Sequence, residues 1–434
     1  MIWLLVTFIV VLLLGAPIVF AFAFSSIVYL LFVSDLPSDM FGAVLYSSLD
    51  SFPLMAIPFF LFAGELMSQG GISKRIINFS RALVGKVKGF LGVITILASG
   101  FFSAVSGSGV ATVAAVGGMM IPEMKRSAYP AGYAAALTAS GAFLGSIIPP
   151  SIPMVMYGFI SNTSIGDLFV AGVIPGFLFV IGFLLLNILA VRKFSLRESE
   201  AEGAGWTADT GQLRKLMLTG KAAFWALLMP VIIIGGIYGG FFTPTESAVV
   251  AVVYALLVSS LIFREMKWGA FVSATVSSAL NTSMLLITLV FATIFSRLLT
   301  IEQVPQKLAD SLLNVTEQQW AIMLIVILFL TLIGMLMDTV TGVILVTPIV
   351  FPILVTGVGM DPVHVGIITV VTLSVGLITP PMAINLFLAG KIADAPMMQI
   401  VRYLPGFLVV SYMVILLLSF LPELVLFLPK WMAG

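Results

Sequence analysis

Two stretches of the chain place a pair of adjacent prolines inside an apolar segment. They read GSIIPPSIP, beginning at Gly145, and GLITPPMAI, beginning at Gly376. Proline has no backbone N–H and its ring clashes with the carbonyl four residues earlier, so each pair should interrupt a helix. The carbonyls of Gly145 and Ser146 lose their helical partners at the first pair, and those of Gly376 and Leu377 at the second. Carbonyl oxygens that converge with Ser and Thr hydroxyls suit a small hard cation such as sodium.

Each proline pair follows a segment rich in Gly, Ser, Thr or Pro. SGSGVATVAAVGGMMIPEM begins at Ser106, and MDTVTGVILVTPIVFPILV begins at Met337. Non-helical backbone is tolerated at membrane depth where it is packed in protein or lines a polar cavity. Two matching arrangements therefore favour a pair of ion sites. The alternative, in which each proline pair only kinks its helix, stays open.

A few polar side chains within the apolar segments are candidates for function. Asp338 is the one acid that we expect well inside a membrane segment, where a carboxylate is costly and marks a functional site by default. Its alternative is a structural pairing with a basic residue or with backbone. Asn385, just past the second proline pair, could donate to a substrate carboxylate or tie two helices together. Glu65 and Arg297 lie near predicted helix ends, where we expect them to snorkel or to face a partner subunit.

The composition identifies the class of protein. Of the 434 residues, 60% are hydrophobic and 9% are charged, whereas soluble domains carry about 25% charged residues. Apolar runs of about 20 residues, long enough to cross a bilayer, recur along the chain. We therefore predict an all-α polytopic membrane protein embedded in the lipid bilayer. The chain has no cysteine and so no disulfide, and its net charge of +1 without a basic patch gives no sign of nucleic-acid binding.

Enzymes and pumps find little support in the sequence. A serine protease in the membrane needs a Ser/His pair there, and the single histidine, His364, is expected in an outer connection. An aspartyl protease needs two acids at one site. Every Gly-Lys pair lacks the Ser or Thr that follows in a phosphate-binding loop, so we expect no ATP hydrolysis by this chain. A channel is also less favoured, because closed hairpins and buried ion sites suit alternating access. We predict a secondary transporter and no enzyme.

The apolar pattern also locates the helices. We expect two re-entrant hairpins over about 92–122 and 321–355, and a capping box at TPTE, beginning at Thr243. The polar stretch 194–221 should be a cytoplasmic linker. Helices are expected near 2–33, 49–72, 131–160, 168–192, 222–240, 247–263, 270–298, 363–393 and 403–428, with interruptions at 149–150 and 380–381.

The two halves of the chain align at an offset of 231 residues, the spacing of the proline pairs. Residues 73–89 carry five basic residues and no acid, whereas 301–319 carry three acids and one lysine. The positive-inside rule places the first stretch in the cytoplasm and the second outside, so the halves should be inverted copies. The same rule places the N-terminus in the cytoplasm and the C-terminus in the periplasm. We expect a first repeat, a linker, a connecting helix and a second repeat over 1–193, 194–221, 222–240 and 241–434.

Three motifs together resemble the large membrane subunit of tripartite ATP-independent periplasmic (TRAP) transporters. They are IPFFLFAGELM (57–67), SGSGVATVAAVGGMMIPEM (106–124) and GGFFTPTESAVVA (239–251), and the resemblance covers essentially the whole chain. It implies sodium-driven import of an organic acid across a bacterial inner membrane by an elevator motion of a transport domain against a scaffold. It also implies a small four-helix membrane subunit, which we expect on a separate chain because nothing precedes Met1, and a periplasmic substrate-binding protein.

The substrate and the site residues are expectations of the same resemblance. It favours sialic acid over four-carbon dicarboxylates, with a single-component anion carrier of the same superfamily as a further alternative. Two or more sodium ions are implied as coupling ions. The first sodium site would use Ser106, Ser108, Gly145, Ile148 and Pro150, and the second Thr339, Gly376, Thr379 and Met382. The residues implied for substrate binding are Ser103, Asp338, Thr341 and Asn385.

Overall fold

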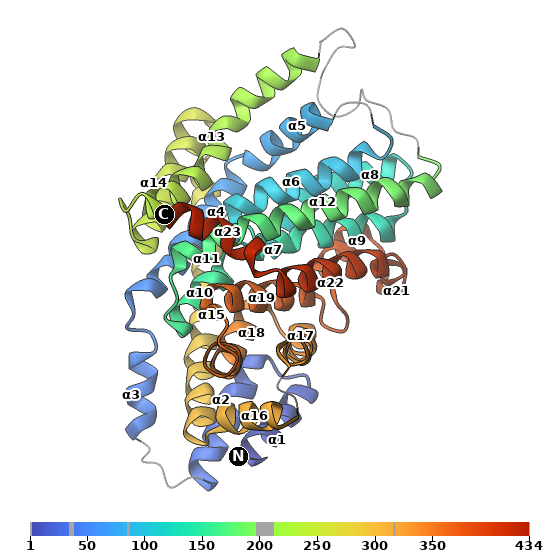
Figure 1. Ribbon diagram of the computed structural model, residues 1–434. Coiled ribbons are helices and arrows are strands. Elements are labelled where there is room, and N and C mark those ends of the chain that lie inside the picture. The colour runs from blue at the N-terminus through green and yellow to red at the C-terminus, as the bar shows by residue number, and fades with distance from the viewer. Residues whose placement is uncertain (1, 34–38, 85–86, 197–211, 316–317, 434) are drawn as a thin grey trace.

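The computed structural model describes residues 2–33, 39–84, 87–196, 212–315 and 318–433, and over these residues it contains helices and no strand (Figure 1). Seven of the helices described are long and apolar enough to cross a membrane, and an eighth span is counted when a bent C-terminal pair is taken as one. The chain is therefore a multi-pass helical membrane protein, as its composition predicts.

The N-terminal segment is two helices and not one. α1 (Ile2–Leu13) ends before Gly15, whose φ of +78° is unfavourable for other residue types, and α2 (Ile18–Phe32) begins after Pro17. The two helices pack against each other. The predicted single helix over 2–33 is therefore wrong, because the glycine and proline reverse the chain in the middle of its apolar run.

The N-terminal pair is attached to the longest helix, α15 (Trp268–Ile301). The rings of Phe8, Phe22 and Phe295 form a cluster with centroids 5.0–5.3 Å apart, a separation typical of favourable aromatic pairs. The Tyr29 hydroxyl donates a hydrogen bond to Glu302, which lowers the pKa of that carboxyl. In Figure 1, α1, α2 and α16 lie together at the lower end of the molecule.

The helices pack into two groups. In the first, here called the framework group, α4 packs against α14 and α15, α13 packs against α14, and α2 packs against α15. This group comprises α1, α2, α3 (Asp39–Ser47), the 3-10 turn Phe52–Met55, α4 (Ala56–Gln69), α13 (Gln212–Tyr238), α14 (Pro244–Leu257) with its π turn Val258–Ile262, and α15.

The second group, here called the hairpin group, contains both proline pairs. Its first half is α6 (Phe90–Ser106), α7 (Gly109–Thr112), the π turn η2 (Val113–Gly117), α8 (Gly118–Arg126), α9 (Ala131–Ala142), η3 (Phe143–Ser146), α10 (Ile152–Ser161), α11 (Ile165–Ala171), α12 (Val173–Ala190) and η4 (Val191–Lys193). Its second half is α17 (Gln319–Leu336), α18 (Thr339–Phe351), η6 (Pro352–Gly357), α19 (Pro362–Val375), η7 (Gly376–Ile378), α20 (Ile384–Ala393), α21 (Met397–Val401), α22 (Leu404–Phe420) and α23 (Pro422–Ala433).

Two helices connect the groups. α5 (Ile72–Val84) packs on α13 of the framework group and on α6 of the hairpin group, and α16 (Val304–Val315) lies in the same way between α15 and the α18–η6 segment. Both helices lie mainly in the charged stretches 73–89 and 301–319, where no helix was predicted. The amphipathic face of α5 explains how it can carry basic residues and still bury Ile72, Ile76 and Ile77.

The order of elements repeats along the chain. α9 begins at Ala131 and α19 at Pro362, and α12 begins at Val173 and α22 at Leu404; both intervals equal the predicted offset of 231. Two antiparallel hairpins occur as well, α6 with α7–α8 and α17 with α18, each turning at a short polar tip. The structure therefore contains the two hairpins that the sequence predicts.

Both proline pairs interrupt a helix. α9 ends in η3 before the first pair and α10 follows it, and α19, η7 and α20 repeat this arrangement at the second. Both Pro-Pro peptide bonds are cis. α9 packs on α20 while α10 packs on α19, so the two broken helices run antiparallel with their breaks close together. Both predicted interruptions are confirmed.

Three other boundaries can be compared with the prediction. The helix expected over 403–428 is α22 and α23, bent by 61° at Pro422. α13 begins at Gln212, so the last part of the predicted linker 194–221 is helical, whereas 197–211 lie outside the described residues. The capping box at the start of α14 is confirmed, because the Thr243 hydroxyl accepts the Glu246 N–H at 3.3 Å and the Glu246 carboxylate accepts the Thr243 N–H at 2.8 Å.

Candidate functional site

A cavity of about 490 Å³ lies between the framework group and the hairpin group. α4 and α15 form one wall, with Gly64, Glu65 and Asn281 among the residues that face it. The other wall is made by both hairpin tips and both helix breaks, through Ser106–Ala111, Ser146, Asp338–Val340 and Leu377. One cavity therefore joins the four irregular segments that the sequence singled out.

The charged groups of this cavity are two carboxylates. Among the residues that line it, Glu65 and Asp338 are charged, and none is Lys, Arg or His. The structure corrects the expectation that Glu65 snorkels or faces a partner subunit, since its side chain borders the cavity from α4. Asp338 is therefore not the single acid at membrane depth. Sequence position alone misassigned Glu65, because it lies only one turn from the end of its helix.

The tip of the first hairpin gathers several oxygen atoms. The Thr112 hydroxyl lies 3.4 Å from the Ser103 hydroxyl and 3.3 Å from the Ser106 hydroxyl, and it donates to the Ser108 carbonyl at 2.9 Å. Ser103, Ser106 and Thr112 are all buried. Such neutral oxygens, held close together, fit a small hard cation. Sequence reasoning missed Thr112, although its position four residues after Ser108 places it on the same helix face.

The first helix break packs directly on this tip. A Cβ added to Gly145 would lie 2.7 Å from the Ser108 carbonyl oxygen, and one added to Gly107 would lie 2.5 Å from the Pro150 carbonyl oxygen. Gly107 also has a φ of +62°, which other residues rarely adopt. Glycine is therefore needed on both sides of the contact, and the predicted residues Ser106, Ser108, Gly145 and Pro150 lie together.

Two details of the first helix break differ from the expectation that its backbone carbonyls are unpartnered and all face the hairpin tip. The Ser151 hydroxyl donates to the Ser146 carbonyl at 2.6 Å, so the oxygen freed by the second proline has a partner. The side chain of Ile148 packs on Gly176 of α12, away from the hairpin tip. Ile148 can therefore contribute to a cation site only through its backbone.

The second set of predicted residues surrounds the second hairpin. The Thr379 N–H donates to the Gly376 carbonyl at 3.0 Å, and the Met382 N–H donates to the Met335 carbonyl of α17 at 3.2 Å. The Thr379 hydroxyl donates to the Val375 carbonyl at 2.7 Å. The Thr339 hydroxyl is buried without a hydrogen-bond partner. A buried polar atom of this kind is usually satisfied by water or an ion, so Thr339 fits a ligand role.

The four residues predicted to bind substrate do not share one surface. Asp338 lines the cavity and also caps α18, because its carboxylate accepts the Thr341 N–H at 3.1 Å and the Thr341 hydroxyl. Thr341 is buried behind it. Ser103 is buried beneath the first tip, and Asn385 is fully buried in α20. Of these four residues, Asp338 borders the cavity, whereas Ser103, Thr341 and Asn385 are not among the residues that line it.

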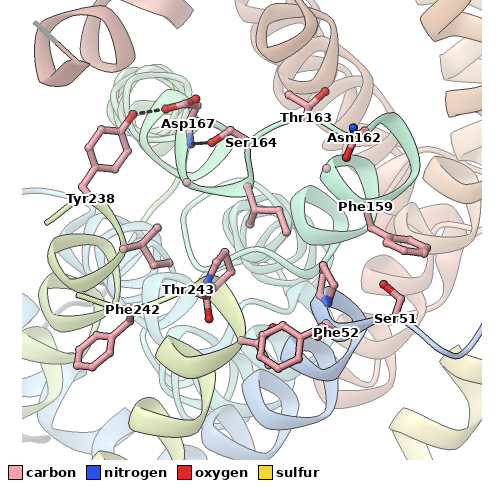
Figure 2. A pocket seen from close by; sticks show the side chains of 17 residues that line it. Ser51, Phe52, Phe159, Asn162, Thr163, Ser164, Asp167, Tyr238, Phe242 and Thr243 are labelled. Atoms are coloured by element: carbon pink, nitrogen blue, oxygen red, sulfur yellow. Dashed lines mark hydrogen bonds between the residues drawn. The ribbon is translucent and has the colours of Figure 1, made fainter. Parts of the chain in front are cut away.

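A second cavity, of about 700 Å³, lies between the same two groups at the other end of α10 (Figure 2). Figure 2 shows Tyr238 of α13 pointing toward Asp167 of α11, and its hydroxyl donates to that carboxylate at 2.5 Å. The Ser164 hydroxyl accepts the Asp167 N–H at 3.2 Å and caps α11. None of the predicted site residues lines this cavity. At this second cavity the framework group and the hairpin group contact each other through few polar side chains, among them Tyr238 and Asp167.

His364 was predicted to lie in an outer connection, but it lies in the first turn of α19. Its side chain is buried, and its Nε2 atom lies 2.9 Å from the Leu418 carbonyl of α22. The histidine thus holds two helices of the hairpin group together, at a distance from the cavity of the hairpin tips.

Comparison with known proteins agrees with this architecture. The YdaH transporter of Alcanivorax borkumensis superimposes with a TM-score of 0.65 over 97% of this chain and 98% of that one, at 15% sequence identity. At that identity the likeness concerns the fold alone.

Sequence comparison gives nearer relatives. The isethionate TRAP transporter permease protein DctMQ of Oleidesulfovibrio alaskensis is 38% identical over 95% of this chain, and the match spans 64% of that longer protein. The C4-dicarboxylate TRAP transporter large permease protein DctM of Pseudomonas aeruginosa is 37% identical over 89% of this chain and 88% of its own length. The sialic acid TRAP transporter large permease protein SiaM of Vibrio cholerae is 33% identical over 97% and 96%.

These relatives are named as transporter permeases and not as enzymes. The model of the family described as "Tripartite ATP-independent periplasmic transporter, DctM component" matches residues 5–424. With helix breaks, hairpins and cavity in the arrangement above, the chain belongs to the DctM component family of tripartite ATP-independent periplasmic transporters.

Proposed function

We propose that this chain is the translocating subunit of a sodium-coupled importer of a small organic anion in a bacterial inner membrane. It works with a small four-helix membrane subunit and a periplasmic substrate-binding protein. The observation that carries the proposal is the cavity between the two helix groups, bordered by both hairpin tips and both helix breaks. Both groups contribute to its wall, the hairpin group more than the framework group, and such a shared wall suits a substrate that is carried when one group moves against the other.

The charge of the cavity supports coupling to a cation. An organic anion that enters beside Glu65 and Asp338 meets two like charges, and such repulsion is strong where water is excluded. Sodium ions bound at the two hairpins offset that repulsion. The first ion would be held by Ser106, Ser108 and the facing break, with Thr112 and Ser103 behind them; the second would be held near Thr339 and the Gly376–Met382 segment.

The same interface supports our proposal of an elevator motion. A Cβ added to Gly64 of α4 would lie 3.0 Å from the Ser106 carbonyl oxygen, so the framework group and the first tip approach each other closely at a glycine. α5 and α16 connect the groups and would tilt as the hairpin group slides. In this scheme the N-terminus is cytoplasmic, the C-terminus is periplasmic, and the cavity opens to each side in turn.

The chemical class of the substrate is an organic acid, and we propose sialic acid as the first compound to test. The relatives are named for different acids, since isethionate, C4-dicarboxylate, sialic acid and 2,3-diketo-L-gulonate permeases are 38%, 37%, 33% and 33% identical. Because these sequence identities are so similar, they do not indicate which acid this chain transports. Several of the acids should therefore be compared in one experiment.

The test is uptake into proteoliposomes that hold this chain and its small membrane subunit. Labelled sialic acid, isethionate and succinate are each supplied with the binding protein of the same system, with and without an inward sodium gradient. We expect uptake of one acid that needs both the gradient and the binding protein. Uptake of another acid from the panel would overturn only the sialic acid proposal. Uptake without the binding protein would indicate a single-component carrier, and uptake indifferent to sodium would overturn the coupling.

A further inference from the structure

Asn385 is a fully buried amide without a partner. It is 0% exposed, and neither its Nδ2 nor its Oδ1 atom has a hydrogen bond. Leaving such a group unsatisfied costs about 1–3 kcal/mol per polar atom. Buried polar atoms of this kind usually contact a water molecule or an ion. The amide is therefore placed to bind something other than a neighbouring side chain.

The amide lies beside the first hairpin, although Asn385 follows the second proline pair. A Cβ added to Gly109 would lie 3.0 Å from Asn385 Nδ2, 3.1 Å from the Ala142 carbonyl oxygen and 3.5 Å from Asn385 Oδ1. α20, which carries Asn385, packs on α7, on η2 and on α9. The second broken helix thus delivers one polar side chain to the tip that belongs to the first half of the chain.

The surroundings of the amide are those of the first oxygen cluster. Gly109 directly follows Ser108, whose carbonyl accepts the Thr112 hydroxyl at 2.9 Å and has the Ser106 hydroxyl at 3.4 Å. A Cβ on Gly145 would lie 2.8 Å from the Gly109 nitrogen, so the helix break closes the same region from the other side. Asn385 does not reach the cavity lining, which argues against direct contact with a substrate there.

We infer that Asn385 is a ligand of the cation held at the first hairpin, through its Oδ1 atom, and not a substrate contact. The inference rests on the proposed sodium coupling. An amide oxygen is a neutral hard ligand of the kind that oxygen-binding cations accept. Binding through Asn385 links the cation at the first hairpin to the broken helix of the second half. Occupancy of this site therefore rigidifies both the first hairpin tip and the second broken helix.

The test uses the purified full chain in detergent and needs no substrate. Thermal unfolding is followed while sodium replaces potassium at constant ionic strength, because a ligand that binds the folded state raises its midpoint temperature. Asn385→Leu removes the amide and keeps the approximate shape, so the variant should fold. We expect its stabilisation by sodium to need roughly tenfold more sodium than the wild type, the effect typical of losing a supporting metal contact. Asn78→Leu, at an amide of α5 that does not line the cavity, is the matched control and should titrate as the wild type does.

Each result has a distinct meaning. An unchanged sodium midpoint in Asn385→Leu overturns the inference. A wild-type protein that sodium does not stabilise any more than potassium overturns the proposed coupling itself, before Asn385 is considered. If Asn385→Leu does not fold, Asn385→Asp decides the matter: a tenfold shift of the sodium midpoint in either direction supports the ligand role, and an unchanged midpoint overturns it.

Discussion

At the scale of single residues, the first hairpin depends on one hydroxyl that no obvious motif marks. Thr112 joins Ser103, Ser106 and the Ser108 carbonyl in one cluster. Because it is buried, its hydroxyl must either bond within the tip or face a bound cation. Its removal should therefore affect sodium binding more than folding.

We expect Thr112→Val, which keeps the β-branched shape and loses the hydroxyl, to raise the sodium concentration for half-maximal uptake roughly tenfold. Thr112→Ser keeps the oxygen and serves as the control, with sodium dependence close to the wild type. The measurement is uptake at increasing sodium and fixed substrate. Equal sodium dependence in Thr112→Val and Thr112→Ser would show that the hydroxyl only stabilises the tip.

Asp338 has two roles that substitution can separate. It caps α18 and lines the cavity, and asparagine caps a helix about as well as aspartate. We expect Asp338→Asn to unfold at the wild-type temperature, because the cap remains, and to lose most sodium-driven uptake, because the negative charge that favours cation binding in the cavity is gone. Asp338→Ala should lose the uptake and also about 1 kcal/mol of stability. Full uptake by Asp338→Asn would assign Asp338 to the cap alone.

The residue scale is also where sequence reasoning was least complete. Ser106, Ser108, Gly145 and Pro150 were expected together from the family resemblance, and the structure places them together. Asn385 was placed with the substrate because it neighbours the second proline pair. The antiparallel crossing of the broken helices brings it to the other hairpin, and no local pattern reports that crossing.

At the scale of elements, the second break depends on a glycine contact. A Cβ added to Gly376 would lie 2.0 Å from the Gly334 carbonyl oxygen of α17. Backbone meets backbone there, so no side chain can move aside. The contact holds the first arm of the second hairpin against η7.

We expect Gly376→Ala to destabilise the protein by at least about 1–3 kcal/mol, the usual cost of overpacking a core. Gly118→Ala is the control, since an added Cβ at that helical glycine meets nothing within 4 Å, and alanine favours a helix. Thermal unfolding in detergent compares the two. A Gly376→Ala protein as stable as Gly118→Ala would mean that the break and α17 are not in this contact in the membrane.

Elements were predicted well where proline pairs and long apolar runs mark them, and poorly where a single residue bends the chain. The run over 2–33 contains Gly15 and Pro17, and the run over 403–428 contains Pro422. Each of these residues is compatible with a continuous helix or with a turn. Packing on α15 decides the outcome for the first run, and packing within the hairpin group decides it for the second. The helices α5 and α16 were not predicted, because their charged residues interrupt the long apolar runs by which the other helices were located.

At the scale of the whole molecule, the proposed motion requires the two groups to slide past each other, and a cysteine-free chain allows this to be tested by cross-linking. A Cβ added to Gly166 of α11 would lie 3.0 Å from Ile237 Cγ2 of α13. The two Cβ atoms are thus within about 4.5 Å, a distance that a disulfide can span.

We expect Gly166→Cys with Ile237→Cys to stop uptake on oxidation and to recover it on reduction. The control pair is Gly182→Cys with Val410→Cys, which joins α12 to α22 inside the hairpin group, where an added Cβ lies 2.6 Å from Val410 Cγ1. Oxidation of that pair should leave uptake intact. Uptake through a fully formed Gly166–Ile237 cross-link would contradict any mechanism in which the hairpin group slides along the framework group.

The two carboxylates of the cavity belong to different groups, and this has a consequence for the empty protein. In the proposed motion Glu65 would stay with the framework group while Asp338 travels with the hairpin group, so the separation of the two acids would change as the groups slide. A cation bound between the two acids would favour the position in which both face one cavity. With sodium as that cation, the preferred resting position of the unloaded carrier would depend on the sodium concentration around it.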